Sequence, residues 1–282
     1  MNLLDQLVKQ DKFSDVEKAI ADYILLHVEE VSSVSISQLA EATYSSNAAI
    51  IRLCRKTGLD GFRQFRVKLA QDYEKSLQNR TDIDINYPFM SHESPKSIMN
   101  SVSIISQEAV KDSYALLPPD LLESAAKKIY KARHVYFYAV GDTYLSALAF
   151  ANMLIKIGIH SVMVNQFNEG MTISYGVTNQ DVGIVVSYSG NLIPYIQDQL
   201  DVLRKNRCPL ILISTMTECP AVDEVIPLPS REQHTGKTAG YYSQESIRYV
   251  LNCLYGIVFS LDIRSNRERK DTADHLAFTS GK

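Results

Sequence analysis

Cysteine is scarce in this sequence, and the placement of the few cysteines excludes two common uses of the residue. No pair has the CxxC spacing of a metal or redox motif, and the six histidines complete no set of metal ligands with them. We therefore expect buried free thiols in a reducing cytoplasm, with no metal site and no other cofactor. The four positions are Cys54, Cys208, Cys219 and Cys253.

Long apolar runs are absent as well. The sequence contains no stretch of about 18 apolar residues, the length that a membrane-spanning helix requires. Its first residues, MNLLDQLVKQDKF, lack the basic start and apolar core of a signal peptide. We therefore expect a cytoplasmic protein without a membrane partner. The 282 residues allow two domains or one large one.

An overall basic excess is also missing, because the net charge is −3. The local distribution of charge is nevertheless uneven. Residues 1–45 contain three lysines and eight acidic residues, a net charge of −5, whereas residues 46–75 contain seven basic and three acidic residues, a net charge of +4. Charges sorted into blocks in this way indicate a basic face with a polyanionic partner.

Apolar residues recur at helical spacing through residues 1–76, which predicts a domain of consecutive helices. In the segment FSDVEKAIADYILLHVEE, Ser14 and Glu17 have the spacing of a capping box. Gly58 is a suitable C-terminal cap for a later helix. The apolar face of the first segment is predicted to contain Val16, Ala19, Ile20, Tyr23 and Ile24.

The pattern changes after this helical domain. Residues 77–96 are polar, contain two prolines and show no sustained period, so we expect a linker. Residues 97–265 begin with helices and continue as short apolar strands that alternate with helices, which predicts a doubly wound parallel sheet covered on both faces. Residues 266–282 are expected to form a polar tail that is frayed or disordered. The predicted fold is thus an all-α domain followed by an α/β domain.

Residues 35–58, SISQLAEATYSSNAAIIRLCRKTG, have the spacing of a helix-turn-helix motif. An α-helix advances about 100° per residue, so Ile50, Leu53 and Cys54 share one face of the second helix and the basic residues lie on the other. The first turn of that helix meets base edges in the major groove, and arginines around it neutralise phosphates. A small helical bundle with a solvated arginine face fits the pattern equally well. The predicted DNA contacts are Ser46, Asn47, Arg52, Arg55, Lys56, Arg63, Arg66 and Lys68.

Residues 185–191, VVSYSGN, end an apolar strand in polar groups before a predicted helix, LIPYIQDQLDVLRK. Backbone N–H groups and the macrodipole at a helix N-terminus favour an anion. The side chains of Ser187, Ser189 and Asn191 complete a possible cradle for phosphate, and Gly190 permits a tight turn. An ordinary strand-to-helix turn, with Ser189 or Asn191 as the N-cap, is the alternative.

A second strand, HVYFYAVG, ends in a similar turn at Gly141, Asp142 and Thr143. Both turns lie at the C-terminal ends of predicted parallel strands, which is where doubly wound sheets bind their ligands. The GxGxxG spacing of a dinucleotide site is absent, and the GKTAG stretch near Lys237 lacks the spacing of a phosphate-binding P-loop.

The stretch ISQLAEATYSSNAAIIRLCRKTGLDGFRQFRVKLAQ resembles the N-terminal domain of RpiR-type regulators, which are bacterial transcription factors named for their control of ribose phosphate metabolism. The resemblance implies that this domain binds DNA. Two positions depart from the family pattern. Tyr44 replaces a glycine in the turn, where a left-handed backbone would strain it. Ala49 replaces a threonine and could contact DNA only through its methyl group, at a thymine methyl.

Residues 119–262 resemble a sugar isomerase, or SIS, domain through YAVGDTYLSALAFANMLIKIG, VVSYSGN and GYYSQESIRYVLNCLYGIVF. The resemblance implies an α/β doubly wound SIS domain with a sugar-phosphate site. Asp142 replaces a small residue that is usual in the family. The residues that the resemblance assigns to the ligand are Gly141, Asp142, Thr143, Ser187, Tyr188, Ser189, Gly190, Asn191, Ser243 and Gln244.

Together the two resemblances imply a transcriptional regulator of carbohydrate metabolism that binds a double-stranded DNA operator and a sugar-phosphate effector. They also imply a homodimer or higher homo-oligomer and no catalysis. A sugar-phosphate isomerase with an accessory helical domain is the main alternative, and a helical domain that binds protein is another. The candidate acid and base groups for an isomerase are Glu169, Glu232, His234 and Glu245, and none has a distinctive partner spacing.

Overall fold

The computed structural model describes residues 2–78, 83–89, 93–164 and 169–279. The chain divides into two compact units, Met1–Asp82 and Ile83–Lys282. The first unit contains the predicted helical domain and the second contains the predicted α/β domain. The described residues 83–89 and 93–96, which were predicted to lie in a linker, belong to the second unit. The linker positions 79–82 and 90–92 lie outside the described residues.

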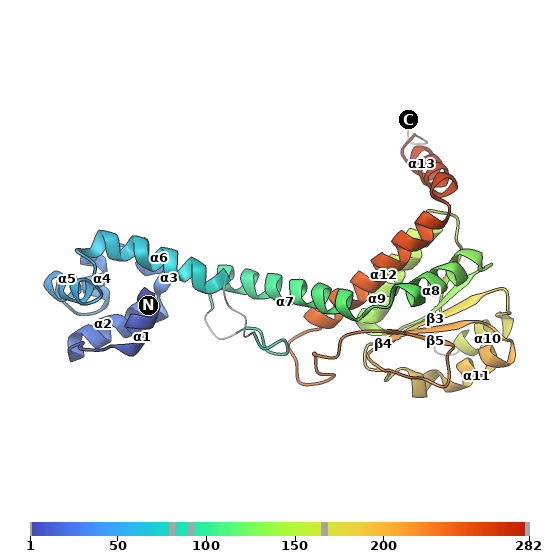
Figure 1. Cartoon of the computed structure of the whole chain (residues 1–282), viewed down its shortest axis with the longest axis horizontal. Helices are drawn as coiled ribbons and strands as arrows, with labels where there is room; N and C mark the ends of the chain where they lie inside the picture. Colours follow the sequence, from blue (N-terminus) through green and yellow to red (C-terminus); the bar gives the residue numbers. More distant parts are fainter. Residues whose placement is uncertain (1, 79–82, 90–92, 165–168, 280–282) are drawn as a thin grey trace. The chain divides into compact units, whose positions relative to one another are not determined.

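The first unit is helical, as predicted, and its core is formed by one face of each helix. The capping box at the start of the second helix is present, because Glu17 Oε2 accepts a hydrogen bond from Ser14 N at 2.7 Å and Ser14 Oγ accepts one from Glu17 N at 3.4 Å. The helices in the described residues are α1 (Leu3–Lys9), α2 (Asp15–Leu26), α3 (Val28–Val31), α4 (Ile36–Ala42), α5 (Asn47–Lys56) and α6 (Phe62–Gln78) (Figure 1).

The prediction for the buried face of α2 was wrong in two positions. The side chain of Val16 is exposed (51%), and Ala19 is also exposed, whereas Glu17 between them is buried (1%). Glu17 can be buried because Lys56 Nζ donates to its Oε2 at 2.6 Å. Apolar periodicity cannot reveal such a pair, because its partners are 39 residues apart in the sequence.

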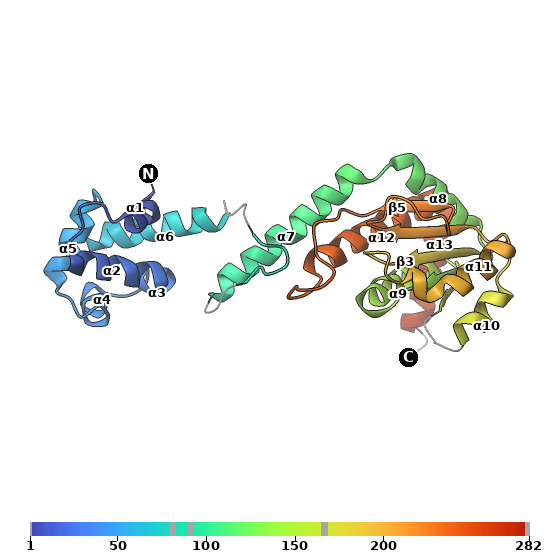
Figure 2. The same ribbon diagram turned by 90° about the horizontal axis from the view of Figure 1, so that it is seen from below.

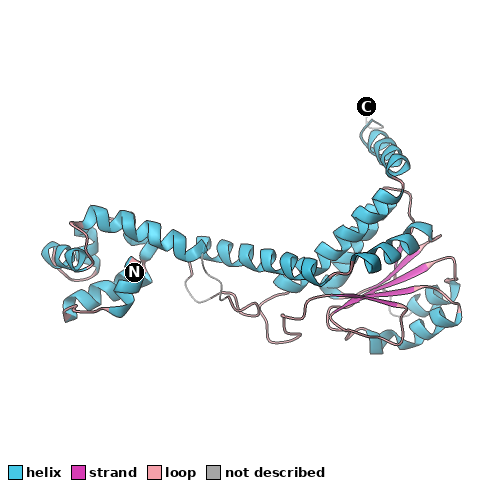
Figure 3. Cartoon of the chain, viewed as in Figure 1, coloured by secondary structure: helices cyan, strands magenta, loops and turns pink. Residues whose placement is uncertain are grey.

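The second unit contains a five-stranded parallel sheet with the strand order β2-β1-β3-β4-β5. Figure 3 shows this sheet in magenta. The register places Phe137 beside Ile184 and Ile184 beside Ile211, so apolar side chains form continuous rows across the sheet. Each strand coincides with a predicted apolar run. The strands are β1 (Val135–Tyr138), β2 (Ser161–Met163), β3 (Val182–Val186), β4 (Leu210–Ser214) and β5 (Glu224–Pro227).

Helices cover both faces of the sheet, as predicted, because successive strand residues point to opposite sides. Ile184 and Ile211 pack on the face covered by α8, α9 and α12, whereas Val185 and Leu212 pack on the face of α11 (Figure 1). The helices of this unit are α7 (Pro95–Leu116), α8 (Pro119–Lys131), α9 (Gly141–Ile155), α10 (Glu169–Gly176), the 3₁₀ helix η1 (Ile193–Ile196), α11 (Gln197–Lys205), α12 (Tyr241–Leu261) and α13 (Ile263–Thr279).

The segment 83–89 packs against α7 and α12, which lie side by side (Figures 1 and 2). Ile85 is buried (6% exposed) in a small cluster with Ile105 of α7 and Tyr242 of α12. The ring of Phe89 meets the ring of Tyr241 edge-on, with 5.6 Å between their centroids. This part of the predicted linker is therefore a packed element of the α/β unit.

The predicted polar tail is helical as far as residue 279, so the expectation of a frayed segment was wrong there. Asn266 is buried, and its Nδ2 donates to Phe259 O at 3.1 Å. Arg269 Nη1 donates to Ile157 O at 3.1 Å. The polar side chains of Asn266 and Arg269 thus satisfy backbone carbonyl groups near the ends of α12 and α9. The polar composition of the tail does not indicate this role. Residues 280–282 lie outside the described residues.

The four cysteines are free thiols, three of them buried and Cys253 half-buried. Burial raises the pKa of Cys54 and Cys208 to about 12, so these two are unreactive at neutral pH. In the part of the chain that the structure describes, no three His, Cys, Asp or Glu side chains form a metal-binding group. No single described helix is long and apolar enough to cross a membrane; α12 and α13 pass that test only as a pair bent by 104°.

Candidate functional site

A cavity of about 320 Å³ opens at the C-terminal ends of β1 and β3. The winding of the sheet reverses between these two strands, so the connections that follow them diverge and leave a crevice. The structure brings eight of the ten predicted ligand residues to this cavity, and Gly141 and Gly190 lie in the backbone turns beside it. The eight are Asp142, Thr143, Ser187, Tyr188, Ser189, Asn191, Ser243 and Gln244.

Gly190 has a backbone that only glycine adopts without strain. Its φ angle is +76°, in the left-handed region. A Cβ atom at this position would lie 2.2 Å from the sulfur of Met216, which is closer than any ordinary contact. The conformation lets Gly190 N donate to Ser187 O at 3.1 Å and closes the turn. The backbone angle therefore favours glycine, and any side chain at this position would also require Met216 to move.

The turn after β3 presents donors to the cavity. Ser187 Oγ accepts a hydrogen bond from Leu192 N at 3.2 Å, which leaves its own proton available. The backbone N–H groups of Ser189 and Asn191 have no acceptor among the described residues. Free amides on either side of a left-handed glycine in one turn can form an anion-binding concavity.

The predicted helix after this turn consists of two parts. A 3₁₀ helix, η1, comes first, and the α-helix α11 begins only at Gln197. Pro194 in η1 has no N–H group to donate. The expected contribution of a long helix macrodipole at the turn is therefore not present, and the donors are the amides and hydroxyls of the turn itself.

Two predicted ligand residues have hydroxyl groups that the protein already uses. Tyr188 OH donates to Pro229 O at 2.8 Å and accepts a hydrogen bond from Glu232 N at 3.4 Å. Burial raises the pKa of Tyr188, which keeps the phenol protonated. Ser243 Oγ donates to Glu232 Oε1 at 2.7 Å. The cavity therefore meets the ring of Tyr188 rather than its hydroxyl, and Ser243 has no free proton.

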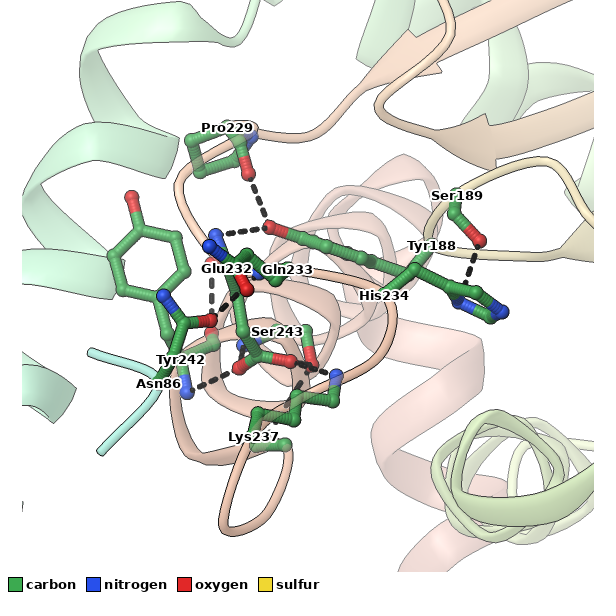
Figure 4. Close-up of polar contacts among 12 residues, drawn as sticks. Asn86, Tyr188, Ser189, Pro229, Glu232, Gln233, His234, Lys237, Tyr242 and Ser243 are labelled. Carbon is green, nitrogen blue, oxygen red and sulfur yellow. Dashed lines mark hydrogen bonds and ion pairs between the residues drawn. The ribbon is translucent and has the colours of Figure 1, made fainter. Parts of the chain in front are cut away.

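Glu232 occupies the N-terminus of α12 with its carboxylate (Figure 4). It accepts hydrogen bonds from Tyr242 N at 3.0 Å and Ser243 N at 2.9 Å, in addition to the Ser243 hydroxyl. Lys237 forms an ion pair with the same carboxylate, whose side chain is fully buried. The helix end that could attract an anion is thus filled by the chain's own carboxylate.

Two basic side chains that line the cavity were not among the predicted ligand residues. Lys237 brings an ammonium group to it, and His234 brings an imidazole whose Nδ1 lies 3.3 Å from Ser189 Oγ. Both belong to the irregular segment 229–240, where the sequence has no period that indicates which side chains turn inward. The sequence signal that could have indicated Lys237 was the GKTAG stretch, although the spacing around this lysine is not that of a P-loop.

The helix-turn-helix geometry is present in the first unit. Helices α4 and α5 are joined by a turn in which Tyr44 has a φ angle of +48°, as its replacement of a glycine suggested. The side chain of Tyr44 is fully exposed (100%). Ser46 is the N-cap of α5 and accepts a hydrogen bond from Ala49 N at 3.2 Å. The predicted apolar face of α5, with Ile50 and Leu53, lies in the core.

The predicted DNA contacts divide into two groups. Ser46, Asn47, Arg52, Arg55 and Arg63 are exposed. Ala49 is buried (2% exposed) in the core, so its methyl group cannot reach a base and the prediction for it was wrong. The remaining three, Lys56, Arg66 and Lys68, donate hydrogen bonds within the protein, and Arg52 Nε also lies 4.0 Å from Glu17 Oε1.

Lys56, Arg66 and Lys68 hold the helical unit together. Lys56 Nζ contacts the buried carboxylate of Glu17 at 2.6 Å, and Lys68 Nζ contacts that of Asp72 at 2.9 Å. Arg66 Nη1 donates to Val34 O at 2.7 Å. Burial raises the pKa of Glu17, but hydrogen bonds from Lys56 and Ser14 outweigh burial and hold this pKa below its usual value. These three cations are therefore weaker candidates for phosphate contacts than Arg52 and Arg55.

Comparisons with known proteins agree with this division into two domains. Residues 1–76 match the family described as "Helix-turn-helix domain, rpiR family", and residues 128–251 match the SIS domain. Among solved structures, the chain is similar to the NanR protein of Vibrio vulnificus complexed with ManNAc-6P. The two are 21% identical, the match covers 98% of each chain, and the TM-score is 0.56.

Two further structures match the second unit. The sugar isomerase domain of an RpiR transcription factor from Sphaerobacter thermophilus is 18% identical, with 62% of this chain and 97% of that chain covered and a TM-score of 0.52. A putative sugar-phosphate isomerase from Listeria monocytogenes is 12% identical, with coverage of 64% and 98% and a TM-score of 0.56. Identities this low establish the fold only. The two domain matches, in this order along one chain, show that the protein is a member of the RpiR-type transcriptional regulators, with an N-terminal helix-turn-helix domain and a C-terminal SIS domain.

Proposed function

We propose that the protein regulates transcription of carbohydrate genes by binding operator DNA through α5 and sensing a phosphorylated sugar in the cavity between β1 and β3. The cavity carries the proposal. Its β3 turn offers the hydroxyl of Ser187 and the free amides of Ser189 and Asn191 to a phosphate. Thr143 and Asp142 face the same cavity from the β1 turn, where they are suited to the hydroxyls of a sugar.

We infer that the site binds its ligand without transforming it. Aldose–ketose isomerisation needs a base with a free lone pair beside the substrate. The carboxylate of Glu232 is already shared among Lys237, two backbone amides and a hydroxyl. Glu245 pairs with Arg248, and neither Glu169 nor Glu245 lines the cavity. His234 does line it, and steady-state turnover of any sugar phosphate would contradict this part of the proposal.

A thermal-shift screen tests the ligand class. The panel contains ribose 5-phosphate, glucosamine 6-phosphate and ManNAc-6P, the last because it occupies the V. vulnificus NanR complex, each beside its unphosphorylated sugar. A ligand at 100 times its Kd stabilises the folded state by about 2.7 kcal/mol. In a unit of this size that corresponds to a rise in Tm of roughly 5–10 °C. A shift with the free sugar and none with its phosphate would contradict the assignment of the Ser187–Asn191 turn.

Replacing Arg52 and Arg55 together with alanine is expected to weaken binding to every duplex. Both side chains are exposed on the outer face of α5, and charged hydrogen bonds contribute roughly 1.5–3 kcal/mol each. The loss of both corresponds to roughly 100-fold or more in Kd, and the salt dependence of log K falls by about 1 for each lost phosphate contact. Fluorescence anisotropy with a duplex selected from a random pool by the wild-type protein measures both quantities.

The matched control for this experiment is the replacement of Lys75 by alanine. Lys75 is exposed on α6, away from the α4–α5 pair, and its loss also removes positive charge. Its replacement should change affinity by less than a few-fold. Equal losses in the control and the double variant would mean that general charge, rather than contact by α5, governs binding.

We further propose that the protein acts in the cytoplasm as a homodimer or higher homo-oligomer. A dimer pairs two reading helices, and half-sites on one face of DNA recur about every 34 Å. A ligand that prefers one arrangement of the subunits would then alter DNA affinity, with a coupling of roughly 1–3 kcal/mol. Sedimentation of the full chain at micromolar concentration, with and without the sugar phosphate, measures the state of association.

A further inference from the structure

The segment 229–240, which we name the pocket loop, joins the ligand cavity to another part of the α/β unit. On the cavity side, Tyr188 OH donates to Pro229 O at 2.8 Å, and Ser189 Oγ lies 3.3 Å from His234 Nδ1. Lys237 lines the cavity as well. The loop therefore contacts the predicted phosphate turn directly (Figure 4).

On its other side the pocket loop is attached to Asn86. Gln233 N donates to Asn86 Oδ1 at 2.7 Å, and Thr238 N donates to Asn86 O at 2.8 Å. Asn86 is itself fixed in a turn, because its N–H donates to Asp84 Oδ1 at 2.8 Å. The two attachments bracket the span that contains His234 and Lys237. Asn86 is therefore the residue to which both ends of this span are attached, and Figure 4 shows it beside Gln233.

The two residues that directly precede this span are firmly anchored. Glu232 is buried against the start of α12. Arg231 Nη1 contacts Glu108 at 3.0 Å and Asp112 at 2.9 Å, both on α7. Residues 233–236, which follow these anchors, are exposed, so they have little packing to resist a shift. The span bracketed by Asn86 is thus the part of the pocket loop that a ligand can move most easily.

An anion in the cavity has a direct means of moving this span. Lys237 is ion-paired with Glu232, and a phosphate held at the Ser187–Asn191 turn brings a second anion to the same cavity. The two anions compete for one ammonium group, whose attraction for either falls with distance. Binding of a phosphate therefore favours a new position of Lys237, and a shift of the lysine backbone would reach the attachments at Gln233 and Thr238.

Asn86 lies eight residues after Gln78, which is the last residue of α6. Helix α6 is the last described helix of the helical unit. We propose that Asn86 transmits the occupancy of the sugar-phosphate cavity to the segment that leads to the helix-turn-helix domain. The proposal rests on the proposed function. It deepens that function by naming the contact through which the ligand regulates DNA binding.

The test measures the coupling between the two ligands in the full-length chain. For each variant, the Kd for the selected duplex is determined with and without a saturating amount of the panel sugar phosphate that most stabilises the wild type. The ratio of the two Kd values in the wild type is expected to be about 5–150. In Asn86→Ala this ratio of Kd values should fall to within about twofold of 1. The rise in Tm with the sugar phosphate should stay close to that of the wild type. The Kd for DNA without ligand should stay within a few-fold of the wild-type value.

Asn86→Asp is the matched variant, because its carboxylate can still accept the hydrogen bond from Gln233 N. It is expected to keep most of the wild-type ratio. If Asn86→Ala does not fold, Asn86→Ser replaces it, since serine keeps a turn-forming hydroxyl but is too short to reach Gln233 in place of the amide. An alanine or serine variant with an undiminished ratio would overturn the proposal, and so would a wild-type ratio of 1 with both ligands bound. A wild type that binds no sugar phosphate or no DNA would instead overturn the proposed function.

Discussion

Replacing Glu232 with alanine is expected to lower the free energy of unfolding of the α/β unit by about 3 kcal/mol or more. Removing one partner from a buried ion pair costs roughly 3–5 kcal/mol, because the other charge is left uncompensated. Here Lys237 retains 22% exposure, which places the effect toward the lower end of that range. The amides of Tyr242 and Ser243, both in buried residues, also lose their acceptor. Urea denaturation of the full chain, monitored in the second unit, measures the loss.

Stabilisation by an added anion is expected to distinguish the loss of the Glu232 carboxylate from a loss of packing alone. Without the Glu232 carboxylate, the N-terminus of α12 becomes an open anion site with two free amides, a serine hydroxyl and a lysine. Inorganic phosphate or sulfate should therefore stabilise Glu232→Ala more than it stabilises the wild type. Glu232→Gln is the graded control, because its amide oxygen can accept from one backbone N–H but cannot pair with Lys237. A loss below about 1 kcal/mol without any anion rescue would show that the carboxylate is dispensable.

Replacing Gly190 with valine is expected to abolish the response to sugar phosphates. A left-handed backbone costs an L-residue roughly 1–2 kcal/mol, and a β-branched side chain is among the least tolerant of it. The new Cβ would also lie 2.2 Å from the sulfur of Met216. The turn must open to relieve both, which moves the amides of Ser189 and Asn191 away from their common anion. We expect no thermal shift at a ligand concentration 100 times the wild-type Kd.

Two control variants separate the backbone strain and the steric clash at position 190 from a general effect of replacing a glycine. Gly176→Ala alters a glycine whose added Cβ meets nothing within 4 Å, so it should leave both Tm and ligand shift unchanged. In the double variant Gly190→Ala with Met216→Ala, the steric clash is removed while the backbone strain remains. Ligand binding restored to wild-type level in this double variant would mean that the clash with Met216, rather than the φ angle, is what excludes a side chain. A full ligand response in Gly190→Val would contradict the assignment of the turn to the phosphate.

The sequence predicted which polar groups lie together where the information is local. The VVSYSGN turn follows a buried strand directly, and the order of apolar runs predicted a parallel sheet whose C-terminal strand ends meet at one edge. Polar groups in two such turns, around Ser187 and Asp142, could therefore be expected to lie together. Likewise, helical periodicity placed Ile50 and Leu53 inside and Arg52 and Arg55 outside. Each of these predictions depends on the spacing of neighbours along one element.

Tertiary structure decided which polar groups are already paired. Lys56 appeared as available as Arg55 in the sequence, yet Glu17, 39 residues away, holds it. Glu232 appeared to be a candidate base, but the start of α12 and Lys237 take up its carboxylate. Asn86 lies in a segment without periodicity and contacts a residue 147 positions later.

The sequence by itself determined the strands, the apolar face of α5 and the polar turns at the strand ends, because side-chain periods of 3.6 and 2 residues are properties of the local chain. Only the folded chain determined that Lys237 and His234 line the cavity, that Glu232 fills the helix end and that Asn86 holds the pocket loop. Hydrogen bonds and ion pairs act over about 3 Å in space, whatever the separation in sequence. Partners brought together by an irregular loop therefore leave no periodic signal in the sequence.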